Sequence, residues 1–78
     1  MVVQPPAEKA LRRLGRTDRE RIIVAIQRLP LGDVRPLRGH IRQWRLRVGD
    51  WRIRFFRDDQ NRVIAVIAVI ARGGAYKA

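Results

Sequence analysis

Two pairs of arginines flank a short turn in the middle of the chain, and one apolar residue separates the members of each pair. The four residues are Arg45, Arg47, Arg52 and Arg54. Arginine stays charged at physiological pH, and its planar guanidinium presents N–H donors that suit phosphate oxygens. A fixed array of arginines therefore indicates binding to a phosphodiester backbone. The same array would stabilise negative charge that develops on a phosphate under nucleophilic attack.

The charge of the whole chain agrees with an anionic partner. The formal net charge is +11 over 78 residues, and 16 of the 18 basic residues are arginine. Residues 35–57 carry +7, whereas the segments before and after them carry +3 and +1. Such a field attracts polyanions and speeds their capture. The alternative is a solvated strand face, but a surface of mixed charges would keep the protein soluble without self-repulsion.

Few other side chains offer chemistry. His40 is the only histidine, and beside a glycine at the start of a strand we expect it on the surface or in a turn. The chain has no cysteine, so we predict no disulfide, no metal site and no cofactor. Phe56 shares the parity of the arginines and is the better candidate for stacking on a base. Trp44 and Trp51 have the opposite parity and are expected in the core.

The alternation of residue types places the arginines on a β-hairpin. IRQWRLRV and WRIRFF have a period of two, and Gly49-Asp50 suits a type II′ turn. Counting outward from this turn pairs Arg47 with Arg52 and Arg45 with Arg54. The other face then carries an apolar ladder of Trp44, Leu46, Val48, Trp51, Ile53 and Phe55. Like charges directly opposite each other destabilise a sheet by up to about 1 kcal/mol per pair, so folding does not explain the arginines.

Two amphipathic helices are expected before the hairpin. Val2-Val3 predicts a short strand that ends at Pro5-Pro6. The first helix has an apolar stripe of Ala7, Ala10, Leu11 and Leu14 and ends at Gly15. Thr17 and Glu20 fit a capping box for the second helix, which Pro30 stops. Its apolar stripe consists of Ile22, Ile23, Ile26 and Leu29. We expect the two helices to form an antiparallel hairpin with one shared apolar seam.

The remaining segments complete a single domain over residues 1–78. Residues 30–39 contain two prolines and two glycines and predict a connecting loop. After a turn at residues 58–61, RVIAVIAVIA predicts a strand covered on both faces in the middle of the sheet. Simple alternation across this turn places Arg72 on the face opposite Arg52. The predicted fold is α+β, with an N-terminal helical hairpin packed on a small, mainly antiparallel twisted sheet.

Neither a membrane span nor an export signal is expected. The longest apolar stretch, Val63 to Ala71, is about half of the length that a spanning helix needs. The first residues lack the basic, apolar and small regions of a signal peptide. We therefore expect a cytoplasmic protein with no membrane partner.

The segment WRLRVGDWRIRF and the later RGGAY resemble the core of RelE-type toxins in the RelE/ParE superfamily of toxin–antitoxin systems. The opening QPPAEKALRRL and the LRG before the hairpin extend the resemblance over nearly the whole chain. The resemblance implies a RelE-like, microbial-RNase-like fold. It also implies a ribosome-dependent endoribonuclease that cuts mRNA and inhibits translation. A cognate antitoxin would bind this toxin in a hetero-oligomer.

The resemblance also implies roles for individual residues. Arg45, Arg47 and Arg52 would bind the phosphate and stabilise the transition state, while Arg72 would act on the leaving side. Tyr76 would stack on a base or orient the nucleophile. The reaction would be a metal-independent attack of the ribose 2′-hydroxyl on the adjacent phosphate. Further contacts with RNA are expected from Arg54, Phe56, Arg42 and Arg57.

Two alternatives remain open at this point. A ParE-like toxin would share the fold and inhibit DNA gyrase without nuclease chemistry. A noncatalytic basic module would bind RNA or an acidic protein. The second alternative is left open because neither arginine nor tyrosine is an obvious base at neutral pH. Gly73-Gly74 also replaces residues that are usually polar or charged in the family.

Overall fold

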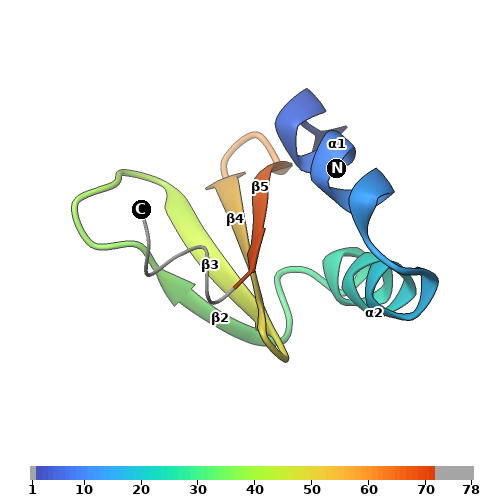
Figure 1. The fold of residues 1–78 in the computed structure, drawn as a ribbon. Coiled ribbons are helices and arrows are strands. Elements are labelled where there is room, and N and C mark those ends of the chain that lie inside the picture. Colours follow the sequence, from blue (N-terminus) through green and yellow to red (C-terminus); the bar gives the residue numbers. More distant parts are fainter. Residues whose placement is uncertain (1, 72–78) are drawn as a thin grey trace.

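The computed structural model describes residues 2–71, which form a five-stranded sheet with both helices on one side (Figure 1). In chain order the elements are β1 (Val2–Val3), α1 (Pro5–Arg13), α2 (Arg16–Gln27), β2 (Asp33–Pro36), β3 (Gln43–Val48), β4 (Trp51–Asp58) and β5 (Val63–Ala71). The strand order is β1-β5-β4-β3-β2. Only the β1–β5 pair is parallel, so the predicted α+β class and mainly antiparallel sheet are confirmed.

The first helix starts on the two prolines that end β1. Pro5 and Pro6 occupy the first turn of α1, where a missing backbone N–H costs no helical hydrogen bond. Ala7 and Leu11 are buried, and Leu14 caps the helix at its C-terminus. The predicted apolar stripe of this helix is therefore its contact with the sheet.

The second helix begins differently from the prediction. Its N-cap is Gly15, no side chain caps the helix, and α2 starts at Arg16. The predicted capping box is wrong because Thr17 lies inside the first turn. Glu20 instead accepts a hydrogen bond from Arg16 one turn earlier.

The two helices seat on different parts of the sheet (Figure 1). Helix α1 packs on β5, and α2 packs against β3. The sequence indicated one apolar seam shared by the two helices. In the structure each helix instead packs its own apolar stripe on a different strand. In α2 the seam consists of Ile22 and Ile26, which are buried, while Ile23 is 39% exposed.

The segment predicted as a loop contains the edge strand β2. Within residues 30–39, Asp33–Pro36 pairs antiparallel with β3, so the loop prediction is wrong for these four residues. The strand is short, mostly exposed, and bonded to the sheet on one side only. Such a strand needs no apolar alternation, which is why its composition is that of a loop.

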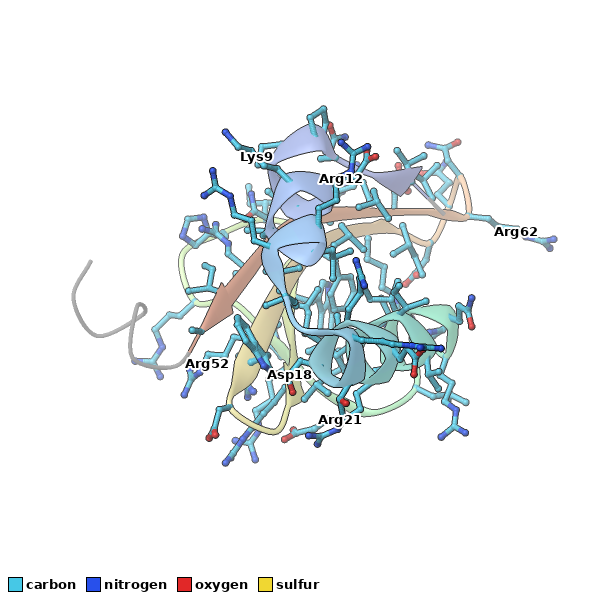
Figure 2. The ribbon with its side chains drawn as sticks, turned by 45° about the vertical axis from the view of Figure 1, so that its right-hand side comes forward. Lys9, Arg12, Asp18, Arg21, Arg52 and Arg62 are labelled. Carbon is cyan, nitrogen blue, oxygen red and sulfur yellow. The ribbon has the colours of Figure 1, made fainter. Side chains whose placement is uncertain are left out.

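The β3–β4 hairpin has the predicted register at every position. Arg47 lies opposite Arg52 and Arg45 opposite Arg54. Gly49 has a φ of 57°, and Asp50 has no positive φ, as a type II′ turn requires. A Cβ atom at Gly49 would lie 3.2 Å from Nη2 of Arg21, a residue of α2 that Figure 2 shows near this turn. The turn therefore needs glycine for its backbone, whereas the flexible end of Arg21 could move away from a larger residue.

Strand β5 contains a bulge that its continuous apolar sequence did not indicate. Phe55 lies opposite Val66 and Arg54 opposite Ala68, so Ile67 has no partner on β4. Beyond the bulge the side chains change faces, and Ile70 lies across from Arg52. The expectation for Arg72 rested on unbroken alternation, and Arg72 itself lies outside the described residues.

The position of β5 also differs from the prediction. It lies between β1 and β4, and β4 is the central strand of the sheet. Only Val66 and Val69 are buried in β5, so the expected burial on both faces is wrong for most of the strand. Strand β4 is longer than predicted and includes Asp58.

The core lies between the helices and one face of the sheet. It consists of Ala7, Leu11, Ile22, Ile26, Leu46, Ile53, Phe55, Val66 and Val69. No polar side chain is buried among residues 2–71. Within the same range, no helix is long and apolar enough to cross a membrane.

Candidate nucleic-acid interface

The face of the sheet that points away from the helices carries arginines in two rows. The first row is Arg35, Arg45 and Arg54, which lie opposite one another on β2, β3 and β4. The second row places Arg47 between Asp33 and Arg52. The rows are about 6.8 Å apart, since two strand residues of about 3.4 Å separate them. We call these five arginines, on three neighbouring strands, the arginine face.

Arg35 is the member of the arginine face that sequence reasoning missed. It lies on β2, in the segment taken for a loop, and it is exposed. Its alternation with Asp33 on one face of a four-residue strand is the only signal in the sequence, and that signal is weak. Only the pairing with β3 shows that Arg35 extends the predicted row to a third strand.

One acid, Asp33 opposite Arg47, lies in these rows, so the five arginines leave the face strongly positive. Within residues 2–71, none of the five arginines forms a salt bridge. Arg35 and Arg47 are exposed, whereas the other three are half-buried. The side chains of Arg45, Arg52 and Arg54 are therefore partly enclosed by their neighbours.

Arg54 is the most constrained arginine of the face. Its Nη2 donates a hydrogen bond to Oε1 of Gln43 on β3. Its Nε is enclosed and has no hydrogen-bond partner among the described residues. An unsatisfied buried donor costs about 1–3 kcal/mol, so this enclosed Nε carries a cost in the folded protein.

Phe56 lies beside the two rows, as its parity predicted. It faces Gln43 on β3 and Ala65 on β5, and it is half-buried. The next position on the same face of β4 toward the turn is Arg54. The ring of Phe56 and the guanidinium of Arg54 can thus contact adjacent parts of one ligand.

Two residues predicted to bind RNA lie elsewhere. Arg57 has the parity of the helix-covered face, and its guanidinium carbon lies 5.4 Å from the ring centroid of Trp44. It also forms an ion pair with Asp59. Arg42 lies outside β3, with Nη1 3.6 Å from Oδ2 of Asp58. Neither arginine joins the arginine face, and both line a separate pocket at the end of the sheet.

Asp58 organises the turn that borders this pocket. Its carboxylate accepts hydrogen bonds from the side chain and backbone of Asn61 and from the backbone of Gln60. The bonds from Asn61 contribute most, and Arg42 and the backbone of Gln60 add less, to holding the pKa of Asp58 below its ordinary value. Asp58 therefore stays ionised and paired at neutral pH.

The other candidate residues divide between core, loop and undescribed chain. Trp44 and Trp51 are half-buried against the core, as predicted. His40 is exposed in the loop before β3. Arg72 and Tyr76 lie outside the described residues. Within residues 2–71, no three His, Asp or Glu side chains converge as metal ligands.

Comparison with known proteins gives the family. The sequence profile of the ParE toxin of the type II toxin–antitoxin system parDE matches residues 2–76. The chain belongs to this toxin family. The resemblance to the RelE/ParE superfamily is thereby confirmed, and the protein is a toxin of a type II toxin–antitoxin system. A search of curated protein sequences finds no match.

Solved structures share the fold of this ParE-family toxin. A chain of the RelB-RelE antitoxin-toxin complex from Methanococcus jannaschii matches with a TM-score of 0.81 and 22% identity, over 99% of this chain and 96% of that one. The archaeal RelE-RelB complex from Pyrococcus horikoshii gives 0.74 and 24%, over 91% of each chain. The isolated E. coli RelE toxin gives 0.69 and 23%, over 97% of this chain and 88% of that one. At these identities the likeness concerns the fold.

Replacing Arg45 with glutamate should stabilise the toxin while it reverses one charge of the arginine face. Residue 45 lies between Arg35 and Arg54, so a carboxylate there would exchange two repulsive cross-strand pairs for two attractive ones. We expect a gain of about 1 kcal/mol in the free energy of unfolding, measured by urea titration at low ionic strength. Added salt should reduce the gain because it screens exposed charges. The neutral Arg45→Gln variant should fall in between, and a destabilised Arg45→Glu variant would contradict the repulsion.

Proposed function

We propose that this toxin is an endoribonuclease that cuts mRNA on the ribosome and so inhibits translation. The observation that supports the proposal is the arginine face, with its rows in register on three strands and Phe56 beside them. The spacing of the rows is comparable to the distance between successive phosphates of an extended RNA strand. One phosphate can therefore lie on each row while a neighbouring base stacks on Phe56.

The proposed reaction is an attack of the ribose 2′-oxygen on the adjacent phosphorus. The bond to the 5′-oxygen of the next nucleotide breaks, and a 2′,3′-cyclic phosphate forms. Negative charge builds on the phosphoryl oxygens, and Arg45, Arg47 and Arg52 stabilise it with preorganised N–H donors. Because arginine supplies this charge stabilisation, the proposed step needs no metal and no cofactor.

Two protons must move in this reaction. The 2′-hydroxyl loses one proton, and the leaving 5′-oxygen gains one. Arg72 is proposed to act on the leaving side, and Tyr76 to orient the nucleophile or stack on a base. Neither residue is among those described, and the arginine face itself holds no histidine. His40 lies in the loop before β3 and is not assigned to proton transfer.

A gyrase-directed activity is the second candidate. The matching profile is that of a ParE toxin, and this match is the observation that supports the second candidate. The arginine face would then bind an acidic surface, and no bond in RNA would be cut. A noncatalytic basic module would use the same face without either effect.

One experiment separates the candidates. The purified toxin is incubated with translating ribosomes, and the 5′ ends of the mRNA are mapped by primer extension, while a parallel reaction follows DNA supercoiling by gyrase. New 5′ ends in phase with codons and unaffected supercoiling are expected. Intact mRNA together with inhibited supercoiling would replace the proposal with the gyrase-directed activity.

We also propose that a cognate antitoxin covers this toxin with an acidic amphipathic segment. The similar solved structures include two antitoxin–toxin complexes. An apolar groove of about 480 Å³ lies between α2 and the β2–β3 edge. Its charged lining consists of Arg21, Arg28 and Arg47 against Glu20 and Asp33, so one positive charge is in excess, and Val24 and Leu31 contribute apolar surface. Leu31 is 72% exposed, so a partner would remove apolar surface from water here.

The antitoxin should raise the melting temperature of the toxin markedly. A domain of this size buries only about 60% of its unfolded surface, so its own stability is low and a partner adds to it by mass action. Thermal unfolding of the toxin is compared with that of the co-purified complex. Leu31→Asp should weaken the complex and leave the unfolding of the free toxin unchanged. A melting temperature that does not depend on the partner would argue against the proposal.

A further inference from the structure

A polar pocket at the end of the sheet has no role in the proposed cleavage. It has a volume of about 390 Å³ and lies between the loop before β3 and the turn after β4. Its lining includes His40, Gln43, Trp44 and Arg57. This combination of flat, hydrogen-bonding groups differs from that of the arginine face.

The charges in this pocket are paired. Arg42 lies 3.6 Å from Asp58, and Arg57 forms an ion pair with Asp59. All four residues line the pocket, so its cations are neutralised by carboxylates of its own wall. A phosphate would meet those carboxylates and be repelled. An uncharged ligand that carries both hydrogen-bond donors and acceptors would not.

The pocket also offers a surface for stacking. The guanidinium of Arg57 lies over the ring of Trp44 at 5.4 Å, and the indole is half-buried and wedged against the core. Bases that are splayed out of single-stranded RNA stack on aromatic rings and on arginine planes. Polar groups of His40, Gln43 and Gln60 surround this pair and can meet the edge of a base.

Gln43 connects the pocket to the arginine face. It lines the pocket, and its side-chain oxygen accepts the hydrogen bond from Arg54. A ligand in the pocket is therefore one side chain away from the first row of arginines. An RNA strand whose phosphates lie on those rows would carry its next nucleotide toward this end of the sheet.

We propose that this pocket binds one unpaired nucleobase of the RNA strand held by the arginine face. The Trp44–Arg57 pair supplies the stacking surface, and the neutral rim excludes phosphate in favour of the base. The inference rests on the proposed function, because it assumes that the arginine face holds RNA. It adds a site that recognises a base, apart from the site that holds the phosphates.

The test measures binding without cleavage. The probe is a fluorescein-labelled single-stranded RNA hexamer with 2′-O-methyl riboses, which cannot undergo attack by the 2′-oxygen. Matched strands each lack one base, and their affinity for the full-length toxin is measured by fluorescence anisotropy. Loss of one particular base should weaken binding about tenfold, as expected for one stacked base.

Two variants connect that loss to the pocket. Trp44→Leu should weaken binding of the intact strand about tenfold and leave binding of the sensitive abasic strand unchanged. Trp44→Phe keeps an aromatic face and should retain most of the affinity for the intact strand. Circular dichroism at the assay temperature confirms that both variants are folded.

Three results would overturn the proposal. They are equal binding of all abasic strands, equal weakening of intact and abasic strands by Trp44→Leu, and failure of the intact strand to bind. If the pocket does not bind a base, the wild-type toxin should still cleave mRNA on the ribosome. If the toxin does not cleave mRNA, primer extension should detect no new 5′ ends even when the intact and abasic strands bind as expected. The two failures can therefore be told apart.

Discussion

Replacing Arg52 with alanine is expected to slow mRNA cleavage by about 100- to 1000-fold, the loss seen when one preorganised donor to a developing anion is removed. Arg52 lies on the central strand β4, where Arg47 and Ile70 flank it on β3 and β5. Its backbone is therefore fixed on both sides, and its side chain is half-buried. The measurement is the rate at which new mRNA 5′ ends appear on translating ribosomes.

Two further variants identify what Arg52 contributes. Arg52→Lys keeps the charge but loses the planar fork of donors, so it should recover only part of the rate. Arg12→Ala removes the same charge from α1, which Figure 2 shows apart from Arg52, and should cleave at the wild-type rate. If cleavage continued unchanged when Arg45, Arg47 and Arg52 were all replaced, the arginine face would not be the active site.

Replacing Phe55 with alanine should remove most of the stability of the toxin. Phe55 is fully buried and is among the largest side chains of the core. Large-to-small changes of this kind cost about 3–5 kcal/mol. Small domains have total stabilities near the lower end of about 5–15 kcal/mol, so little would remain. Urea unfolding followed by circular dichroism measures the loss.

The neighbouring residue provides the matched control. Phe56→Ala is the same change one position later, on the arginine face instead of the core side of the sheet. We expect a smaller loss of stability and about a tenfold loss of affinity for single-stranded RNA, since one stacking surface disappears. Equal effects of the two variants on stability would contradict the assignment of faces.

The register of the hairpin could be predicted because the sequence determines it twice. Gly49 fixes the turn, and strict alternation on both sides assigns every side chain to a face. The arginine pairs and the position of Phe56 followed from these two constraints alone. The part of the candidate site that depends only on β3 and β4 was therefore accessible from sequence.

The parts that were missed lack such constraints. Strand β2 is a short edge strand of polar and turn-forming residues, and only its partner reveals it, so Arg35 was overlooked. The apolar run of β5 has no alternation, so nothing in it indicated the bulge at Ile67. Arg42 and Arg57 were grouped with the other arginines by composition, while their neutralising partners come from the turn after β4.

The edge formed by β2 also bears on how the toxin behaves at high concentration. An open sheet edge exposes backbone groups that can pair with a second chain and lead to aggregation. Here the edge is only four residues long, carries Arg35, and ends at Pro36, which has no N–H to donate. The charges of Asp33 and Arg35 cancel along this strand, so its short length and the missing N–H of Pro36 are what leave two such edges few bonds to make. We therefore expect this edge to pair poorly with a second copy of the chain, which would limit edge-to-edge aggregation at high concentration.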